Sequence, residues 1–416
     1  MFRRVYLDNS ATTPVDPEVI EAMMPYLTGK FGNASSIHFF GQEARAAVDK
    51  ARHQVADLIN ARPNEIVFTS GGTESNNLAI RGLVSSPHVS KGFSGENRPH
   101  IITSAIEHSC VINVCEDLEK QGYAVTYLPV YENGIVHIDD IEAAITEYTV
   151  LISIMTANNE IGTIQPVAEI GKLIKSLRES GRKIWFHTDA VQAAGKIPVD
   201  VEEIGCDLLS ISAHKIYAPK GVGALYVRRG VRLHPLNIGG HQERERRGGT
   251  ESVPHIVAFG KACELAKAGL YGSPDEVGAS VSSTSSMQDL RILRDEFESA
   301  VGETIPGIVF NGERTRRLPN ISNISFRGVE GEGLLINLDM QGVAVSTGSA
   351  CSSGSLEPSP VIRALGRDEE LARGAIRFSL GKQNSADDID YLLDVLPKAV
   401  ENLRRLAPHF HKQSVG

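Results

Sequence analysis

Short apolar runs recur along the first half of the chain, between about residues 63 and 225. Several runs, such as 150–155 and 208–212, contain few polar residues, which is typical of strands buried on both faces of a sheet. Between them, apolar residues recur at the spacing of one helix face, so the pattern predicts a mainly parallel sheet covered by helices. The expected strands are residues 65–69, 100–103, 125–128, 150–155, 183–187, 208–212 and 224–227, and the expected helices are residues 43–59, 110–121, 139–148 and 167–180.

The pattern changes from about residue 254 onward. A long helical stretch is followed by shorter strand-like runs at 321–326 and 375–380 and by a helix over 387–406. This order predicts a second, α+β unit, and 416 residues exceed what one hydrophobic core usually serves. We therefore expect an α/β fold with a seven-stranded sheet in a large domain, residues 15–257, and a smaller domain formed by residues 1–14 and 258–416.

The composition is that of a globular protein, with 41% apolar and 22% charged residues. The net charge of −9 argues against non-specific binding to nucleic acids or anionic membranes, because both require clustered Lys and Arg. No window approaches the roughly 20 apolar residues of a membrane span, and the N-terminus has no long apolar signal segment. We expect a cytoplasmic protein with neither membrane nor nucleic acid as a partner.

The five cysteines are widely spread and form neither a CxxC pair nor a cluster with zinc-ligand spacing, so we expect a reducing compartment and no bound metal. They are Cys110, Cys115, Cys206, Cys263 and Cys351. Cys351 differs from the others because it lies within residues 346–355, a run built almost entirely of Gly, Ser, Ala and Thr. Such a run has no side chains large enough to build a core, so Cys351 is predicted to be a nucleophilic thiol on a flexible arm.

A glycine pair follows the first predicted strand and precedes a helix, in the run 69–74 (TSGGTE). This arrangement leaves the backbone N–H groups of Gly71, Gly72 and Thr73 at the positive end of the helix dipole, where a phosphate would fit. A turn capped by the side chain of Thr73 or Ser70 is an equal alternative. The run matches neither the dinucleotide-binding pattern nor the P-loop pattern.

The strand over residues 208–212 delivers Ser212, His214 and Lys215 to its carboxyl end, where open α/β sheets bind their ligands. A partly desolvated lysine has a lowered pKa and can form a Schiff base with a carbonyl. A solvated loop lysine beside a histidine is the commoner case for an isolated His–Lys pair, and it stays open here. Lys220 is a rival amine, although a position between proline and glycine is typical of an exposed turn.

Four further polar residues follow or lie within predicted strands. Asp189, in the run 187–192 (HTDAVQ), is suited to hold a pyridinium N–H or to cap the following helix. His108 offers a flat ring and Asn159 offers an amide. Arg377 lies in an alternating strand, where a buried guanidinium would bind an anion such as a carboxylate and an exposed one would mean little.

Taken in chain order, these segments resemble the cysteine desulfurases, which are pyridoxal-phosphate enzymes of the class V aminotransferase group within fold type I. The resemblance runs from residue 6 almost to the C-terminus. The motifs that carry it are residues 6–14 (YLDNSATTP), 32–38 (GNASSIH), 69–74 (TSGGTE), 107–108 (EH), 158–162 (NNEIG), 187–192 (HTDAVQ), 212–215 (SAHK), 247–250 (RGGT), 349–351 (SAC) and 377–381 (RFSLG).

The resemblance implies a pyridoxal 5′-phosphate cofactor carried by Lys215, which would later move protons at the substrate α-carbon. Thr73, Ser212 and His214 would hold the cofactor's phosphate together with the backbone of Gly72. The complete set of cofactor-binding residues that the resemblance implies is Gly72, Thr73, His108, Asn159, Asp189, Gln192, Ser212, His214, Lys215 and Thr250.

The resemblance also implies how the cofactor ring is held. His108 would stack on the ring, Asp189 would pair with the pyridine nitrogen, and Gln192 would bond to the phenolic oxygen. Thr250 would reach the phosphate from the partner subunit, so a homodimer is implied.

Asn159 and Arg377 would bind the substrate carboxylate, and the catalytic residues would be Lys215, Cys351 and His108. The implied reaction converts L-cysteine to L-alanine and leaves the sulfur on Cys351 as a persulfide. A sulfur-acceptor protein would then receive it for iron–sulfur cluster, thio-cofactor or transfer-RNA biosynthesis.

Two residues depart from the common family pattern, since Ala34 stands where proline is usual and Gly72 where many members have alanine. A selenocysteine lyase is the alternative function, because the polar stretch over residues 85–99 resembles those enzymes.

Overall fold

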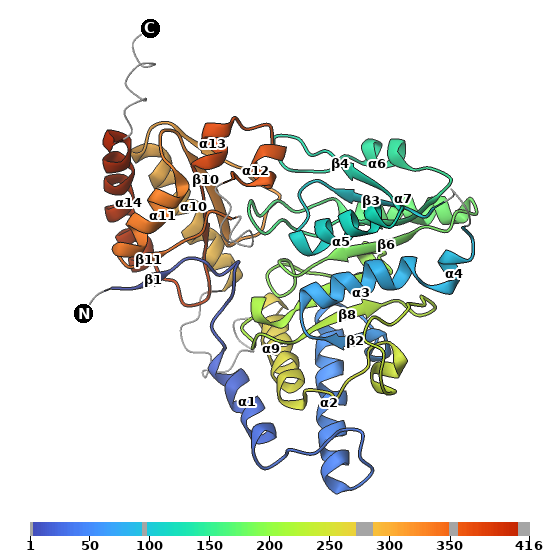
Figure 1. The fold of residues 1–416 in the computed structure, drawn as a ribbon. Helices are drawn as coiled ribbons and strands as arrows, with labels where there is room; N and C mark the ends of the chain where they lie inside the picture. The colour runs from blue at the N-terminus through green and yellow to red at the C-terminus, as the bar shows by residue number, and fades with distance from the viewer. Residues whose placement is uncertain (1–2, 94–97, 272–285, 349–356, 407–416) are drawn as a thin grey trace.

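The structure is a computed structural model that describes residues 3–93, 98–271, 286–348 and 357–406 (Figure 1). Its largest sheet has seven strands in the order β2-β8-β7-β6-β5-β3-β4. Every pair is parallel except those that β8 makes with β2 and β7. The prediction of a mainly parallel, seven-stranded sheet is confirmed. The strands are β2 (Ile66–Thr69), β3 (His100–Ser104), β4 (Ala124–Leu128), β5 (Thr149–Ser153), β6 (Trp185–Asp189), β7 (Leu208–Ser212) and β8 (Gly223–Val227).

Helices cover both faces of this sheet because its strands carry apolar residues on both sides. Val67 packs with α3 and α5 on one face, whereas its neighbours Ile66 and Phe68 pack with α2, α7 and α9 on the other. The helices of this unit are α1 (Pro17–Leu27), α2 (Phe39–Leu58), α3 (Gly72–Val84), α4 (Pro87–Ser90), α5 (Ser109–Lys120), α6 (Ile138–Ala144), α7 (Val167–Glu179), α8 (Val201–Ile204) and α9 (Val253–Tyr271), with 3-10 turns η1 (Pro63–Glu65), η2 (Ala213–Lys215) and η3 (Gln242–Glu245).

A second unit lies to one side of the large sheet and has its own apolar core (Figure 1). Its three antiparallel strands have the order β12-β10-β9, and β1 pairs in parallel with β11. Val5 and Leu7 lie in this core, so the start of the chain packs with its last third. The elements are β1 (Val5–Tyr6), α10 (Met287–Thr304), β9 (Ile308–Phe310), β10 (Ile321–Phe326), α11 (Gly331–Met340), β11 (Val343–Ala344), α12 (Pro360–Ala364), α13 (Glu369–Arg373), β12 (Ala375–Ser379) and α14 (Ala386–Leu406).

The predicted domain boundary at residue 257 lies inside α9. Phe259, Cys263 and Ala266 all follow that boundary, yet they belong to the core of the large sheet. The helix α9 therefore packs as one piece against α1 and α2.

Several predicted elements have ends that differ from the observed ones by one to four residues. The helix expected over 139–148 stops at Ala144, because Thr149 Oγ1 accepts the backbone N–H of Thr146 and Thr146 Oγ1 accepts that of Tyr148. Such side-chain bonds compete with helical ones. The strand expected over 183–187 is β6, which reaches two residues further, to Asp189.

A buried ion pair fixes the segment around η3 to the edge of the large sheet. Arg52 Nη2 lies 2.7 Å from Glu243 Oε1, and both side chains are less than one-tenth exposed. Glu243 Oε2 also accepts the backbone N–H of Phe68 in β2. The pair therefore ties α2, β2 and the chain that leads to Thr250.

We predict that Arg52→Met lowers the free energy of unfolding by about 3–5 kcal/mol, because it leaves the Glu243 carboxylate buried and uncompensated. Arg405→Met is the control, since Arg405 pairs with Glu401 at an exposed position and its loss should cost about 1 kcal/mol or less. Urea unfolding followed by circular dichroism measures both variants. Equal losses for the two would contradict this account of the buried pair.

Candidate active site

Most of the predicted site residues gather where strands of the large sheet end. β6 ends at Asp189 and β7 ends at Ser212, and parallel strands present their carboxyl ends at the same edge of a sheet. The extended residues 8–13 reach this edge from the smaller unit, since Asn9 N–H donates to Ser379 O and Thr13 N–H donates to His214 O. The site therefore lies where the two units meet.

The start of α3 is free of side-chain caps. Its N-cap is Gly71, with φ +151° and no side-chain bond to the first turn, so the alternative of a cap by Thr73 or Ser70 is wrong. A Cβ on Gly72 would lie 2.9 Å from Val191 Cγ2 and 3.6 Å from Ser212 Cβ, which explains why glycine occurs here. The first N–H groups of this 13-residue helix lack intrahelical partners, which is the setting that an anion prefers.

Lys215 faces the protein rather than solvent. Its Nζ donates to Ser10 O at 2.5 Å and to Ala11 O at 2.7 Å. The alternative of a solvated loop lysine does not describe this amine. Lys220, the rival, is exposed in the turn that follows.

His214 lies beside Lys215 and forms a 3.1 Å hydrogen bond between Nδ1 and Thr12 Oγ1. Burial, followed by the nearby charges of Lys215 and Lys220, lowers the pKa of His214 to about 4. The ring is therefore neutral at neutral pH, so one of its nitrogens donates a hydrogen bond and the other accepts one.

The carboxylate of Asp189 is buried and held from two sides. Asn76 Nδ2 donates to its Oδ2 at 2.6 Å, and Val191 N–H donates to its Oδ1 at 2.9 Å. The second bond belongs to a turn and not to a helix, because residues 190–196 form no helix. Asp189 is therefore a fixed acceptor at the end of β6.

His108 is the N-cap of α5, and its Nδ1 accepts the backbone N–H of Cys110 at 3.2 Å. Since an N–H can only donate, Nδ1 carries no proton in this arrangement, and the neutral ring carries its proton on Nε2. Cys110 Sγ lies 2.9 Å from the same Nδ1.

Gln192 is buried with its amide held at both ends. Its Nε2 donates to Ser10 O at 2.9 Å, and its Oε1 accepts from Lys196 Nζ at 2.9 Å. Ser10 O thus receives hydrogen bonds from both Gln192 and Lys215.

Arg377 is buried, so the alternative of a solvent-facing guanidinium is wrong. Its Nη2 lies 2.7 Å from Asp8 Oδ1, and its Nη1 donates to Asn159 O at 2.9 Å. Its Nε is buried without a hydrogen-bond partner among the described residues. Asn159 meets Arg377 through its backbone.

Two predicted residues are less closely bound to this group. Thr73 and Thr250 are both exposed. Thr250 follows Arg247, whose Nε lies 2.8 Å from Glu74 Oε1 in the first turn of α3.

Cys351 lies outside the described residues, but the chain on either side of it is described. A Cβ on Gly348 would lie 2.6 Å from Glu160 Oε2, and Ser359 Oγ donates to the same oxygen at 2.6 Å. Both flanks therefore meet one buried carboxyl group, in the residue that follows Asn159.

Several residues of the site were not singled out from the sequence. Asp8, Asn76 and Lys196 contact Arg377, Asp189 and Gln192 respectively. Asp8 lies inside the matched run 6–14 and Lys196 follows the run 187–192, but nothing in the sequence gives their contacts.

Glu107, which precedes His108, also lies close to the site and interacts with Asp189. Its Oε1 accepts from Ser104 Oγ at 2.7 Å and from Met155 N–H at 2.9 Å, while its buried Oε2 has no partner among the described residues. Burial, reinforced by the charge of Asp189, raises the pKa of Glu107 to about 8. The group is therefore mainly protonated at neutral pH.

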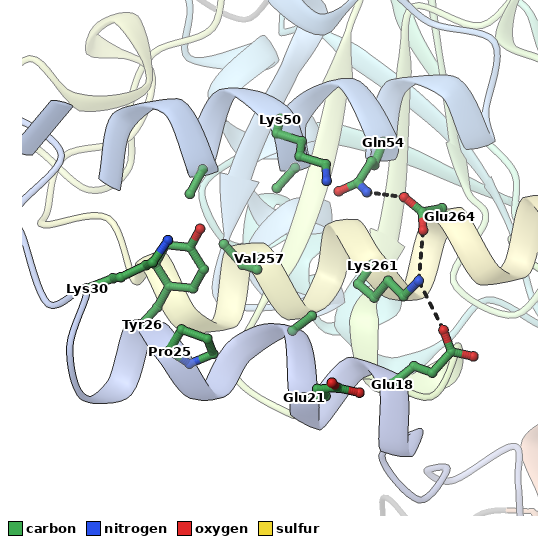
Figure 2. A pocket seen from close by; sticks show the side chains of 13 residues that line it. Glu18, Glu21, Pro25, Tyr26, Lys30, Lys50, Gln54, Val257, Lys261 and Glu264 are labelled. Atoms are coloured by element: carbon green, nitrogen blue, oxygen red, sulfur yellow. Dashed lines mark hydrogen bonds and ion pairs between the residues drawn. The ribbon is translucent and has the colours of Figure 1, made fainter. Parts of the chain in front are cut away.

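A surface groove of about 460 Å³ lies between α1, α2 and α9, and none of the predicted site residues lines it (Figure 2). Lys261 lies in it between Glu18 Oε2 at 3.1 Å and Glu264 Oε1 at 2.8 Å (Figure 2). Three of its charged groups, those of Glu18, Lys261 and Glu264, are thus paired with one another.

Within the described ranges, no helix combines the length and apolar character needed to cross a membrane. In the same part of the chain, no three His, Cys, Asp or Glu residues are grouped so that they could hold a metal ion.

Comparison with known proteins identifies relatives along nearly the whole chain. The family described as aminotransferase class-V matches residues 5–392. The cysteine desulfurase IscS of Dictyoglomus turgidum is 51% identical over 409 residues, which are 98% of this chain and 98% of the relative. The cysteine desulfurase IscS of Methanosarcina thermophila is 48% identical and the alignment covers 98% of this chain and 94% of the relative.

Solved structures agree with these relatives. A NifS-like protein has a TM-score of 0.83 and 35% identity, with 97% of this chain and 99% of that chain covered. The structure titled SspA in complex with cysteine has a TM-score of 0.76 and 37% identity, with 92% of this chain and 100% of that chain covered.

The pKa of Glu107 leads to a prediction about stability and pH. Between the unfolded value of 4.5 and the folded value of about 8, the folded state keeps a proton that the unfolded state has lost, so stability falls as pH rises. Glu107→Gln removes this dependence. We expect the variant to gain stability relative to the wild type from pH 5 to pH 8, by at most about 1.4 kcal/mol per pH unit.

Thermal unfolding at several pH values measures the difference. Glu116→Gln on the exposed face of α5 is the matched control, and its difference from the wild type should stay constant. A constant difference for Glu107→Gln as well would show that Glu107 is not protonated in the folded state.

Proposed function

This chain belongs to the aminotransferase class-V family and is a cysteine desulfurase, and we propose that it acts with pyridoxal 5′-phosphate bound where the two units meet. One observation carries the proposal: the amine of Lys215, the carboxylate of Asp189 and the uncapped start of α3 converge at one edge of the large sheet. These are the groups that an aldehyde, a pyridinium N–H and a phosphate require. The relatives named above support the same reaction class.

The residues present fit this cofactor. Gly72 provides a close approach for backbone N–H groups next to Ser212, and Asn76 fixes Asp189 so that the carboxylate cannot turn away. Asn76 Oδ1 and Ser10 Oγ are buried without partners among the described residues. Unsatisfied buried polar atoms are rare, so their presence here supports a bound polar group.

We propose that the phosphate is held by the start of α3 and the side chains of Thr73, Ser212 and His214. Asp189 would pair with the pyridine nitrogen, and His108 would stack on the ring. When bound, the cofactor supplies an electron sink for the bonds at the substrate α-carbon. The full set of proposed cofactor-binding residues is Gly72, Thr73, His108, Asn159, Asp189, Gln192, Ser212, His214, Lys215 and Thr250.

Arg377 and Asn159 would bind the carboxylate of L-cysteine. The buried Nε of Arg377 supports this role, because it has no partner in the described part of the chain and would gain a strong hydrogen bond from an anion. Asp8 and the backbone of Asn159 hold the other two nitrogens and thereby fix the plane of the guanidinium.

Lys215 would remove the proton from the substrate α-carbon, and its two backbone acceptors keep the amine on the side of the site. His108 would act at the reacting atoms through Nε2, since its Nδ1 is occupied by the N–H of Cys110. The N–H of the neutral ring can thus donate a hydrogen bond where negative charge develops.

Cys351 would attack the sulfur of the bound cysteine. The new S–S bond forms as the bond between sulfur and the β-carbon breaks, the β-carbon takes a proton, and the products are L-alanine and a Cys351 persulfide. The enzyme thiol and the substrate supply all atoms and electrons. We propose a protein as the later sulfur acceptor, for iron–sulfur cluster, thio-cofactor or transfer-RNA biosynthesis.

The cysteines support a reducing, cytoplasmic location. Cys110, Cys115, Cys206 and Cys263, which are the cysteines that the structure describes, are all free thiols.

We propose that the active molecule is a homodimer. Ile37, two residues before α2, and Phe39, its first residue, are 91% and 72% exposed, and the exposed rings of Phe31 and Phe40 lie 5.7 Å apart. Large exposed apolar side chains that lie close together are typical of protein interfaces. A second copy of the chain would cover them and would bring its Thr250 to the phosphate.

The desulfurase assignment predicts how three variants behave with L-cysteine as substrate. Lys215→Ala should lower alanine formation by at least about 10²-fold, since it removes the proton-transferring amine. Cys351→Ser should abolish the persulfide, because no thiol remains to accept the sulfur. Lys220→Ala, which removes an exposed lysine five residues away, should behave like the wild type.

Alanine release and persulfide labelling by an alkylating probe measure these outcomes. Full persulfide formation by Cys351→Ser would exclude the proposed nucleophile. Turnover of L-selenocysteine without turnover of L-cysteine would favour the lyase alternative, and a wild type that binds no pyridoxal phosphate would exclude the proposed cofactor.

The position of Thr250 is tested by mixing two inactive variants. Thr250→Asp would place a carboxylate against the phosphate, and Lys215→Ala would remove the amine. If Thr250 acts across the dimer, a mixed dimer contains one intact site, and refolding an equal mixture should restore roughly a quarter of wild-type activity.

No recovery on mixing would show that Thr250 acts within its own subunit or not at all. Ser252→Asp is the matched control, because it adds the same charge two residues away at an exposed position and should leave activity unchanged.

A further inference from the structure

Lys196 is a lysine buried without a carboxylate. Its exposed fraction is 6%, and no Asp or Glu among the described residues lies within ion-pair distance of its Nζ. Lysines are almost never fully buried unless paired, because removing the ammonium from water is costly. A methionine of similar length would avoid this cost, so we expect the lysine to have a function at this position.

The side-chain amine of Lys196 has both of its hydrogen bonds to described residues with one partner. Its Nζ donates to Gln192 O at 3.0 Å and to Gln192 Oε1 at 2.9 Å. The charge of the lysine is therefore directed at a single side chain of the site, four residues earlier in the chain.

This contact decides which end of the Gln192 amide faces the site. Lys196 Nζ donates a hydrogen bond to Oε1, and Nε2 donates to Ser10 O at 2.9 Å. Ser10 O can only accept, so both ends of the amide agree on one orientation. The same carbonyl accepts from Lys215 Nζ, which places the NH₂ group of Gln192 next to the catalytic amine.

We propose that Lys196 is a positioning residue that keeps the amide NH₂ of Gln192, and not its oxygen, turned toward the phenolic oxygen of the cofactor. The proposal rests on the proposed function, because it assumes that pyridoxal phosphate binds beside Lys215. Without Lys196 only Ser10 O selects the orientation of the amide, and Oε1 has lost its donor, so the NH₂ group is fixed less firmly. A donor that is fixed in advance stabilises the phenolate more than one that is held less firmly.

The positive charge near Lys215 acts in the same direction. Burial, together with the charges of Lys215 and Arg377, lowers the pKa of Lys196 to about 7. A hydrogen-bond donor to the phenolate oxygen makes protonation of the Lys215 nitrogen less favourable when that nitrogen is bound to the cofactor. A nearby positive charge has the same effect.

The test is Lys196→Met in the full-length, cofactor-loaded protein. The visible absorption of bound pyridoxal phosphate is followed as a function of pH. We expect the pH at the midpoint of the absorption change to rise by about one unit, because the phenolate oxygen loses its fixed hydrogen-bond donor. The affinity of the protein for pyridoxal phosphate, measured by fluorescence titration, should fall by about tenfold.

A double-mutant cycle separates positioning from charge. Gln192→Leu alone should also raise the midpoint, and Lys196→Met should add little in the Gln192→Leu background, since the lysine acts through the amide. An undiminished shift in that background would show that the lysine acts by its charge alone and would overturn the proposal. An unchanged midpoint in Lys196→Met alone would overturn it as well.

Two further variants complete the experiment. Lys220→Met is the matched control, because it removes a nearby positive charge at an exposed position without touching Gln192, and its midpoint should stay close to that of the wild type. Lys196→Ala takes the place of Lys196→Met if the latter does not fold, with the same expected shift. A wild type that binds no pyridoxal phosphate would instead refute the proposed function.

Discussion

Lys215 and Gln192 both donate to the carbonyl oxygen of Ser10, and this shared acceptor is the contact on which the site depends. Ser10 belongs to an extended segment that is fixed to the smaller unit through Asn9 and Ser379 and to the large sheet through Thr13 and His214. Because the segment is anchored at both ends, its carbonyl oxygens have fixed positions. The site is therefore built where one segment joins the two units through contacts with residues 201 and 370 positions later in the chain.

The electrostatics of the site follow from what is buried around that segment. Glu107 lies behind Asp189, and its raised pKa keeps it mainly neutral, so the two carboxyl groups do not repel each other in a medium that screens little. Arg377 is balanced by Asp8, which is one-fifth exposed. The site therefore presents the carboxyl group of Asp189 at the end of β6 and the amine of Lys215 at the end of β7, which are the groups that a phosphorylated pyridine aldehyde would need.

The fold could be predicted largely from apolar runs. β7 and β10 have the predicted bounds, because strands buried on both sides appear in the sequence as mainly apolar runs. The end of α6 could not be predicted in this way, since it is set by hydroxyl bonds of Thr146 and Thr149.

The same distinction applies to the site residues, since some of them could be predicted from the sequence and others could not. Ser212 and Asp189 were found because they end strands, and strand ends are visible in the sequence. Asp8 and Asn76 were not found, because each is defined by a contact with a residue 369 or 113 positions away. Lys196 was missed for another reason: a lysine after a glycine reads as a surface residue until its burial is known. Family resemblance added the roles that local patterns left open, and for the individual residues these roles stay predictions.

Unsatisfied polar atoms give an independent argument for what the site is for. Four of the buried side-chain atoms without partners among the described residues are Ser10 Oγ, Asn76 Oδ1, Glu107 Oε2 and Arg377 Nε. Each such atom costs about 1–3 kcal/mol in a protein that must fold without its missing partner. Of the four, Ser10, Asn76 and Arg377 directly touch Lys215, Asp189 or Asn159. The other such atoms among the described residues belong to Ser86, Tyr226, Arg246, Arg317, Asn320 and Ser322, but the group beside an amine and a carboxylate is what a polar ligand would complete.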